Sequence, residues 1–285
     1  MTFIPVDGPL DLRATFMSGQ AFRWREDVPW FVGVIFDNVV KVRQVAGGIE
    51  FQSAPDEESS VAPMLRDYLH LDTDLDEVYA SISIDDRVAE AIARHRGMRV
   101  LRQDPWETLM CFICATASNI PRITKNVEDL CETFGRPVRL DGHVRYTYPK
   151  PNDLAEADEE AIRGIRLGYR AAYLVSTARA VAEGKVDLMS LREDSYEEAL
   201  ESLVTLDGVG DKVANCVTLF SLDKLQAFPV DTWIIKILRD WYLKGNRKKL
   251  SPKNMRIWAV DHFGPYAGYA NHYLFHDRRL TARGR

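Results

Sequence analysis

The chain has 285 residues, of which 46% are hydrophobic and 10% aromatic, so it can form one large or two ordinary domains with a substantial core. No segment has the uninterrupted apolar length of a membrane span, and the first residues, MTFIPVDGPLDL, lack the pattern of a secretion signal. The formal net charge of −5 argues weakly against a nucleic-acid partner. We therefore expect a cytoplasmic protein without a membrane partner.

The first third of the chain predicts an antiparallel β-sheet. The runs WFVGVIF, NVVKVRQV and IEFQ are rich in β-branched and aromatic residues, and Asp37-Asn38 and Gly47-Gly48 separate them. From about residue 60 the apolar residues recur at helical spacing, and Gly97 marks a boundary. The sequence thus predicts an α+β protein with an N-terminal β domain with flanking helices over residues 1–97 and an all-helical domain over residues 98–285.

The sequence predicts two helix starts in the helical domain of residues 98–285. Asp104 precedes Pro105 in DPWETLMCFICATA, and Ser195 stands three residues before Glu198, which is the spacing of a capping box. The cysteines also lie in apolar helical patterns, where buried free thiols are expected: Cys111, Cys114, Cys131 and Cys216.

The possible metal and redox motifs are weak. The CFIC segment has redox spacing, but cysteines three residues apart on an apolar helix more simply form one buried face. His272 and His276 are spaced like metal ligands without an evident third ligand. No four-cysteine cluster follows the glycine-rich turn of residues 206–210, so we expect no iron–sulfur cluster there.

Positive charges gather late in the chain, with only Asp240 opposing them between residues 236 and 256. A basic run is usually a solvated surface, so it indicates DNA binding only in combination with other features. Its members are Lys236, Arg239, Lys244, Arg247, Lys248, Lys249, Lys253 and Arg256.

The segment LDGVGDKVANCV, residues 206–217, predicts two helices joined by a tight turn. Gly208 and Gly210 allow close backbone approach, and amides at a helix start suit a DNA phosphate without reading its sequence. Such a turn also occurs in ordinary helix pairs. Lys212 adds chemistry, because partial desolvation near a positive helix end disfavours the charged amine, and a neutral amine is a nucleophile.

A charge partner for this lysine follows in AFPVDTWIIKIL, where Asp231 precedes an amphipathic helix. Taken singly, Asp231 is typical of a helix N-cap and Lys212 of an exposed helical lysine. Together, a glycine hairpin with an embedded lysine and a later Pro-Val-Asp resemble the helix-hairpin-helix, Gly/Pro/Asp superfamily of DNA glycosylases. The following segments, in family order from residue 18 to 275, resemble the 8-oxoguanine DNA glycosylase family: SGQAFRWRE, LRQDPWETLMCFICATASNIPRIT, LGYRAAYLVSTARA, SYEEAL, LDGVGDKVANCV, LDKLQAFPVD and GPYAGYANHYLF.

This resemblance implies a bifunctional DNA glycosylase and abasic-site lyase of base excision repair that flips 8-oxoguanine out of double-stranded DNA. Lys212 would attack C1′, expel the base and form a Schiff base that permits β-elimination. Asp231 would stabilise positive charge on the sugar or assist lysine deprotonation. The carbonyl of Gly19 would accept from the N7–H that distinguishes 8-oxoguanine from guanine. Phe275 and Cys216 would cover the faces of the base, and Asn271 would meet its Watson–Crick edge.

The resemblance also implies contacts outside the base pocket. On the opposite strand the orphaned base would meet Asn119, Arg122, Tyr169 and Arg170. The phosphate contacts would come from Gly208, Gly210 and Trp233. No cofactor is expected for catalysis, but a structural monovalent or divalent cation would be held by the main-chain carbonyls of Val204, Leu206 and Val209.

The chain departs from the family pattern at several positions. Ala117-Ser118-Asn119 replaces an asparagine run, so the resemblance leaves open which base is preferred opposite the lesion. Trp233 replaces a histidine, and Arg278 replaces an acid beyond the stacking phenylalanine. Asp207 replaces a proline, which we expect to loosen the hairpin turn.

Two other functions compete with this prediction. A monofunctional glycosylase for alkylated bases would lack the lysine, and a non-catalytic helix-hairpin-helix module that only binds DNA would need neither Lys212 nor Asp231. We expect a monomer, because one flipped base needs only one subunit. The expected location is the cytoplasm, at the nucleoid, in a prokaryote, or the nucleus in a eukaryote.

Overall fold

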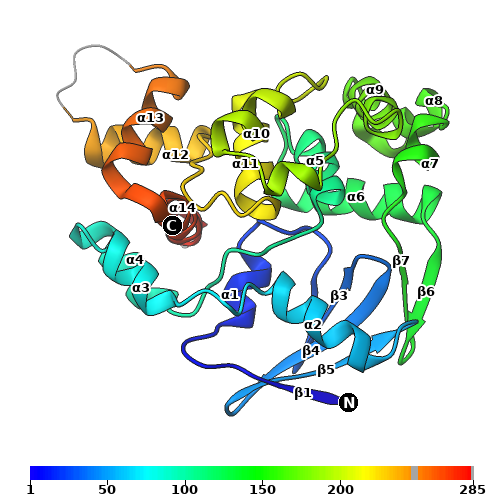
Figure 1. Ribbon diagram of the computed structural model, residues 1–285, viewed down its shortest axis with the longest axis horizontal. Helices are drawn as coiled ribbons and strands as arrows, with labels where there is room; N and C mark the ends of the chain where they lie inside the picture. The colour runs from blue at the N-terminus through cyan, green and yellow to red at the C-terminus, as the bar shows by residue number, and fades with distance from the viewer. Residues whose placement is uncertain (245–249, 284–285) are drawn as a thin grey trace.

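The computed structural model describes residues 1–244 and 250–283 and begins with an antiparallel sheet (Figure 1). The strand order is β1-β5-β4-β3-β2, so each strand pairs with its sequence neighbour except β1, which pairs with β5. The three strands predicted from the sequence are confirmed, and two short edge strands are added to them. The strands are β1 (Thr2–Pro5), β2 (Arg25–Asp27), β3 (Trp30–Ile35), β4 (Asn38–Val45) and β5 (Gly48–Ala54).

Both faces of the sheet are covered, which explains why β3, WFVGVI, carries no polar side chain. One face packs against α1 (Leu12–Met17) and α2 (Glu58–Tyr68), with Phe51 fully buried between them. The other face buries Val32, Val34 and Val39 against Val138 and Leu140, which belong to a later hairpin.

That hairpin, β6 (Pro137–Leu140) and β7 (His143–Tyr146), corrects the prediction that everything after residue 97 is helical. Asp141 and Gly142 form its two-residue turn with φ of +48° and +80°, the backbone conformation of a tight hairpin. In Figure 1 the hairpin descends from the helices toward the sheet. The hairpin exists because the second face of the sheet needs an apolar cover, which is a tertiary requirement.

The rest of the chain is helical. Ahead of the hairpin come α3 (Leu75–Ile82), α4 (Asp86–Arg94), α5 (Pro105–Cys114) and α6 (Ile120–Phe134). After it come α7 (Pro151–Ala155), α8 (Glu159–Ile162), the π-helical turn η1 (Arg163–Leu167), α9 (Arg170–Ala182), the 3₁₀ turn η2 (Ser190–Arg192), α10 (Tyr196–Leu203) and α11 (Asp211–Ser221). The last are α12 (Thr232–Ile237), the π-helical turn η3 (Leu238–Tyr242), α13 (Pro252–Phe263), the 3₁₀ turn η4 (Gly264–Tyr266) and α14 (Ala267–Arg283).

Both helix starts read from the sequence are confirmed. The Asp104 carboxylate accepts from the amide of Glu107 at 2.7 Å, and Ser195 with Glu198 forms the complete capping box. The boundary near Gly97 stays a prediction; α3 and α4, which precede it, pack with α14 in the large helical core. Arg247, Lys248 and Lys249 of the basic run lie outside the described residues.

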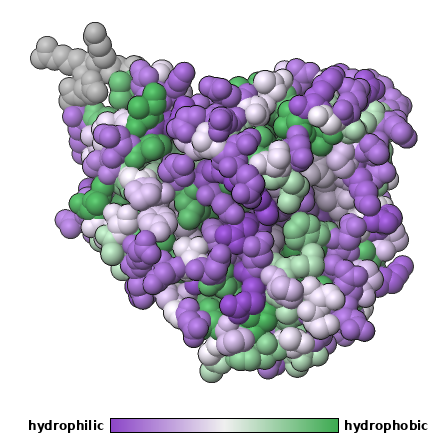
Figure 2. Space-filling model, in the orientation of Figure 1, coloured by the Kyte–Doolittle hydropathy of each residue, from purple (hydrophilic) through white to green (hydrophobic). Residues whose placement is uncertain are grey.

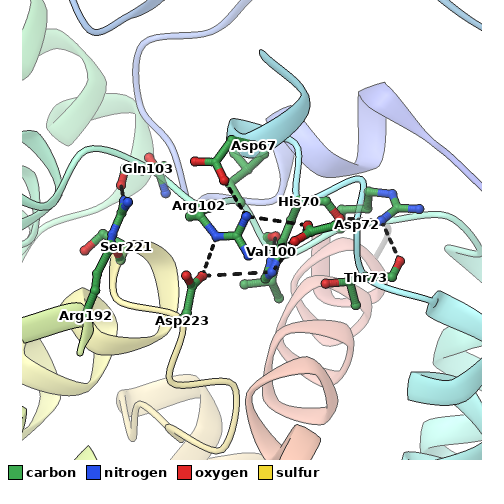
Figure 3. A network of polar contacts seen from close by, with 12 residues as sticks. Asp67, His70, Asp72, Thr73, Val100, Arg102, Gln103, Arg192, Ser221 and Asp223 are labelled. Atoms are coloured by element: carbon green, nitrogen blue, oxygen red, sulfur yellow. Dashed lines mark hydrogen bonds and ion pairs between the residues drawn. The ribbon is translucent and has the colours of Figure 1, made fainter. Parts of the chain in front are cut away.

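Arg102 ties the β part to the end of α11 (Figure 3). Its guanidinium donates to Asp67 in the last turn of α2 at 2.5 Å and to Asp223 after α11 at 2.6 Å, and Asp72 lies within 3.3 Å. Next to Arg102, the backbone N–H of Gln103 donates to the carbonyl of Phe220 at 2.8 Å. This network holds the far end of the helix that carries Lys212.

Hydrophilic side chains cover most of the face seen in Figure 2, and hydrophobic ones form small separate groups. Within residues 1–244 and 250–283, no helix combines the length and apolar character that crossing a membrane requires.

Candidate active site

A cavity of about 260 Å³ collects most of the residues that the sequence singled out. Its walls come from the turn after α1, the end of α5 and the following loop, and the helices α6, α11, α12 and α14. The predicted residues on its lining are Gly19, Asn119, Lys212, Cys216, Asp231, Trp233, Asn271 and Phe275. Segments separated by up to 256 positions along the chain, from Gly19 to Phe275, therefore meet at one site.

Lys212 is the second residue of α11, in the first turn of the helix, as predicted; Asp211 separates it from the N-cap Gly210. The helix start directs this side chain into the cavity, where Nζ lies 4.9 Å from the centroid of the Phe112 ring. Cys216 lies one turn further on the same helix face, and burial raises the pKa of its thiol to about 11 against the opposing effect of Lys212. The thiol is therefore a neutral, compact part of the wall.

The start of α11 is anchored from behind. The side chain of Asn215 donates to the carbonyl of Asp211 at 2.7 Å and accepts from the Tyr196 hydroxyl at 2.6 Å. Arg256 donates to that hydroxyl at 3.1 Å and to the Asp211 carboxylate at 3.2 Å. This chain of hydrogen bonds fixes the first turn of the helix, and with it the base of the Lys212 side chain.

Asp231 is the N-cap of α12 and accepts from the amide of Ile234 at 2.8 Å. Burial raises the pKa of its carboxyl above the usual range, although the Ile234 amide and the nearby Lys212 act in the opposite direction. The predicted cap is confirmed, and the carboxylate lines the cavity from the wall next to α11. A cap hydrogen bond thus holds an anionic group in place beside an amine.

Gly19 occupies a conformation that a side chain would disturb. Its φ is +93°, and a Cβ there would lie 2.6 Å from Cδ1 of Ile120 and 3.2 Å from Nη1 of Arg279. The next residue, Gln20, is almost fully buried; its Nε2 donates to the carbonyls of Thr15 and Arg99 at 2.9 and 2.8 Å. The turn therefore presents backbone, not side chain, to the cavity.

α14 supplies the wall facing this turn. Phe275 is half-buried on the cavity lining. Asn271, one turn earlier, is buried and donates Nδ2 to the carbonyl of Pro229 at 2.9 Å, which leaves Oδ1 as the part of the amide that can accept from a ligand. Arg278 instead pairs with Asp240 at 3.4 Å and stacks 5.2 Å from the ring of Trp241, away from the cavity lining.

The glycine hairpin lies beside the cavity. Gly208 has φ +78°, and a Cβ there would approach the Tyr173 side chain to 2.8 Å; Gly210 has φ −94° and open space around a Cβ. Their amides donate to no backbone carbonyl within the described part of the chain. The expected loosening by Asp207 is countered, because its carboxylate accepts from Ser176 and its carbonyl accepts from Thr177 at 2.9 Å.

The residues predicted for the opposite strand surround the loop between α5 and α6. Asn119 caps α6, and its carboxamide accepts from the amide of Arg122, an exposed residue, at 3.1 Å. Tyr169 is 50% exposed. Arg170 is buried, and its guanidinium donates to the carbonyls of Thr116 and Ala117. In this structure Arg170 holds the loop in place; a direct contact with a base stays a prediction.

The CFIC cysteines and the histidine pair, His272 and His276, are buried in the core. Cys111 and Cys114 are free and buried, and burial raises the pKa of Cys114 to about 12, which disfavours the thiolate that redox chemistry needs. Burial also lowers the pKa of His276 to about 3, and His272 is buried against Phe220. Within the described residues, no group of three His, Cys, Asp or Glu side chains is arranged to hold a metal ion.

The sequence analysis did not assign several of the other lining residues to the site, among them Phe112, His272 and Arg279. Phe112 lies inside the CFIC segment, where the cysteine spacing drew attention to the other helix face. Arg279 follows Phe275 at the i, i+4 spacing, which places two side chains on one helix face. The sequence spacing could therefore have predicted that Arg279 lies beside Phe275.

Comparison with known protein families places the chain in one of them. Residues 4–109 match the model of the 8-oxoguanine DNA glycosylase N-terminal domain, and residues 110–259 match that of the HhH-GPD superfamily of base excision DNA repair proteins. The chain belongs to the 8-oxoguanine DNA glycosylase family. The resemblance seen in the sequence is confirmed, as is the order of a sheet followed by a helical part.

Relatives of this glycosylase family match over nearly the whole chain. The N-glycosylase/DNA lyase OGG1 of Arabidopsis thaliana is 37% identical over 283 residues, covering 93% of this chain and 76% of the relative. A structure of MBOgg1 with a low-affinity DNA ligand has a TM-score of 0.91 at 35% identity and covers 99% of this chain and 100% of that one. The 8-oxoguanine glycosylase/lyase of Clostridium acetobutylicum, bound to double-stranded DNA with cytosine opposite 8-oxoguanine, has a TM-score of 0.90 at 29% identity and covers 99% and 100%.

Proposed function

We propose that this protein is a bifunctional DNA glycosylase and abasic-site lyase that excises 8-oxoguanine from double-stranded DNA. The observation that carries the proposal is the meeting of Lys212, Asp231, Gly19 and Phe275 on one cavity in a chain of this family. An amine, a carboxylate, an exposed backbone turn and an aromatic ring are the groups that base extrusion, recognition and displacement need.

The chemistry starts from the neutral amine of Lys212. Nζ attacks C1′ of the flipped nucleotide, the C1′–N9 bond breaks, and the base leaves with its bonding electrons and takes up a proton. Opening of the sugar then gives a protonated Schiff base between Nζ and C1′. Loss of a proton from C2′ and cleavage of the C3′–O bond complete β-elimination. Asp231, held by its cap hydrogen bond, either stabilises positive charge on the sugar or accepts the lysine proton.

Recognition uses the walls described above. The Gly19 carbonyl accepts from N7–H of 8-oxoguanine and repels the N7 lone pair of guanine. Phe275 stacks on one face of the base, and the neutral thiol of Cys216 covers the other. Oδ1 of Asn271 accepts from the Watson–Crick edge, while one hydrogen of Nδ2 donates to the carbonyl of Pro229.

Binding of the duplex involves the surfaces beside the cavity. Arg122 and Tyr169 fill the gap left by the flipped base, while Asn119 and Arg170 hold the loop that meets the orphaned base. The amides of Gly208 and Gly210, with Trp233, contact the phosphates. The carbonyls of Val204 and Val209 accept from no backbone amide in the described part of the chain, which fits their binding, with Leu206, a structural cation.

No part of this chemistry calls for a catalytic cofactor or an iron–sulfur cluster. We place the protein with its DNA substrate, at the nucleoid or in the nucleus according to the organism. The two competing functions have less support, because neither a water-based glycosylase nor a purely DNA-binding module accounts for an amine and a carboxylate on the same cavity.

The test is excision and borohydride trapping on duplexes with 8-oxoguanine opposite each of the four bases. Lys212→Gln is compared with the parent, and Lys150→Gln, an exposed lysine outside the cavity, is the matched control. We expect the parent and the control to excise and to cross-link, and Lys212→Gln to do neither. Excision without trapping would make water the nucleophile, and absence of excision would favour a DNA-binding module. The ranking of opposite bases gives the opposite-base preference that the resemblance leaves open.

A further inference from the structure

Arg279 is a buried arginine on the wall of the base pocket that the chemistry above does not use. It follows Phe275 by one turn of α14, is 6% exposed and lines the cavity. A buried guanidinium needs several partners, because removing its charge from water is costly. The partners therefore show what the side chain holds together.

Its contacts join the two opposing walls. Nη2 donates to the carbonyl of Met17, two residues before Gly19, at 2.7 Å. The guanidinium carbon lies 5.6 Å from the centroid of the Phe275 ring, which is cation–π distance. Nη2 also lies 3.2 Å from Nδ1 of His276. One side chain thus contacts both the turn that presents the Gly19 carbonyl and the ring proposed to stack on the base.

The Gly19 turn is confined on its other sides as well. Cδ1 of Ile120 and Nη1 of Arg279 both crowd the position of a Cβ on Gly19. Gln20 is tied to the carbonyl of Arg99 at 2.8 Å and accepts from the amide of Leu101 at 2.9 Å. Of these restraints, the contacts from Arg279 connect the turn to α14, which carries Phe275 and Asn271.

Rigidity matters more for rejecting guanine than for accepting the lesion. With 8-oxoguanine, the Gly19 carbonyl is attracted to N7–H and moves toward it. This hydrogen bond therefore forms even when the turn is movable. A carbonyl facing the lone pair of guanine is repelled and withdraws if it can, which removes the penalty. We propose that Arg279 is a positioning residue for lesion selectivity: it fixes the Gly19 carbonyl against the Phe275 wall, so that guanine is rejected. This inference rests on the proposed function.

The experiment measures selectivity separately from catalysis. Dissociation constants for duplexes with 8-oxoguanine or guanine opposite cytosine are measured in a Lys212→Gln background, so that the lesion is not excised. Arg279→Leu removes the guanidinium contacts with the Met17 carbonyl and the Phe275 ring, and Arg279→Lys keeps the charge but loses the planar donor fork. Arg278→Leu is the matched control, because this neighbouring arginine points to Asp240 and Trp241.

We expect the ratio of the guanine to the 8-oxoguanine constant to fall about tenfold in Arg279→Leu, to fall less in Arg279→Lys and to stay unchanged in Arg278→Leu. In the Lys212-containing protein, cleavage of preformed abasic sites, which hold no base, should change less than about twofold while 8-oxoguanine excision slows.

An unchanged ratio in Arg279→Leu would overturn the inference, as would a parallel loss of abasic-site cleavage, which indicates general damage to the site. If Arg279→Leu does not fold, Arg279→Lys decides: a ratio equal to that of the parent overturns the inference. A parent that neither excises nor prefers 8-oxoguanine would instead overturn the proposed function.

Discussion

At the scale of single residues, Asp231 joins two tasks in one side chain. It closes the first turn of α12 through the Ile234 amide and faces the cavity that holds Lys212. Because an N-cap needs only an acceptor oxygen, whereas charge stabilisation needs an anion, the two tasks respond differently to substitution. The same separation exists at Asn271, whose Nδ2 serves the fold and whose Oδ1 is left for a ligand.

Substitutions of Asp231 should separate the stability contributed by its N-cap hydrogen bond from the catalytic effect of its negative charge. Asp231→Asn keeps the acceptor for Ile234, so the free energy of unfolding should change by less than about 0.5 kcal/mol, while Asp231→Ala should lose about 1 kcal/mol. Excision should fall by about 100-fold or more in both. Chemical denaturation and single-turnover excision measure the two effects. Equal stability losses would show that the cap contact contributes nothing.

The raised pKa of Asp231 predicts the acid side of the pH profile. If the ionised carboxylate is the active form, excision falls as pH drops through this pKa. Because burial raises the pKa, the fall starts at a higher pH than for an ordinary aspartate. Single-turnover rates between pH 4 and pH 8 test this point. An identical acid limb in Asp231→Asn would assign the titration to another group.

At the scale of elements, the hairpin before α11 shows two glycines with different requirements. Gly208 needs to be glycine for the fold itself, because its φ is positive and Tyr173 occupies the space of a Cβ. Gly210 has ordinary extended backbone angles and open space, so within the protein alone a side chain is tolerated there. The free space at Gly210 is what a phosphate approaching the start of α11 would use.

Alanine at these two positions should therefore give opposite results. Gly208→Ala should lower the free energy of unfolding by about 1–3 kcal/mol through strain and the clash with Tyr173. Gly210→Ala should leave stability within about 0.5 kcal/mol and weaken binding of undamaged duplex about tenfold. Thermal unfolding and fluorescence anisotropy measure these quantities. Parent-like DNA affinity in Gly210→Ala would place the phosphate contact elsewhere.

At the scale of the whole molecule, two ion pairs join the β parts of the chain to the helices. Arg23, in the turn before β2, pairs with Glu107 of α5 at 3.2 Å, and Arg145 of β7 pairs with Glu128 of α6 at 2.6 Å. Burial raises the pKa of Glu107 to about 7, with Arg23 opposing that effect. Part of the connection between the two layers therefore depends on pH.

The sign of this dependence follows from proton linkage. A carboxyl whose pKa is raised on folding stabilises the protein most below its unfolded pKa, and that contribution is lost as pH rises to about 7. The parent should lose free energy of unfolding as the pH rises from 4.5 to 7.5, whereas glutamine cannot ionise. The difference in free energy of unfolding between Glu107→Gln and the parent should therefore shift by about 1–3 kcal/mol in favour of the variant. Urea unfolding at both pH values measures the change. A constant difference would mean that Glu107 titrates normally.

The sequence by itself determined the local features: three strands, two helix caps, and the glycine hairpin with Lys212 and the later Asp231. These depend on contacts within a few residues, which alternation, capping and turn chemistry make readable. Only the tertiary structure decided the β6–β7 hairpin, which exists because the second face of the sheet needs a cover. It also decided the different surroundings of Arg278 and Arg279, since successive residues on a helix point about 100° apart and packing selects which one faces the cavity.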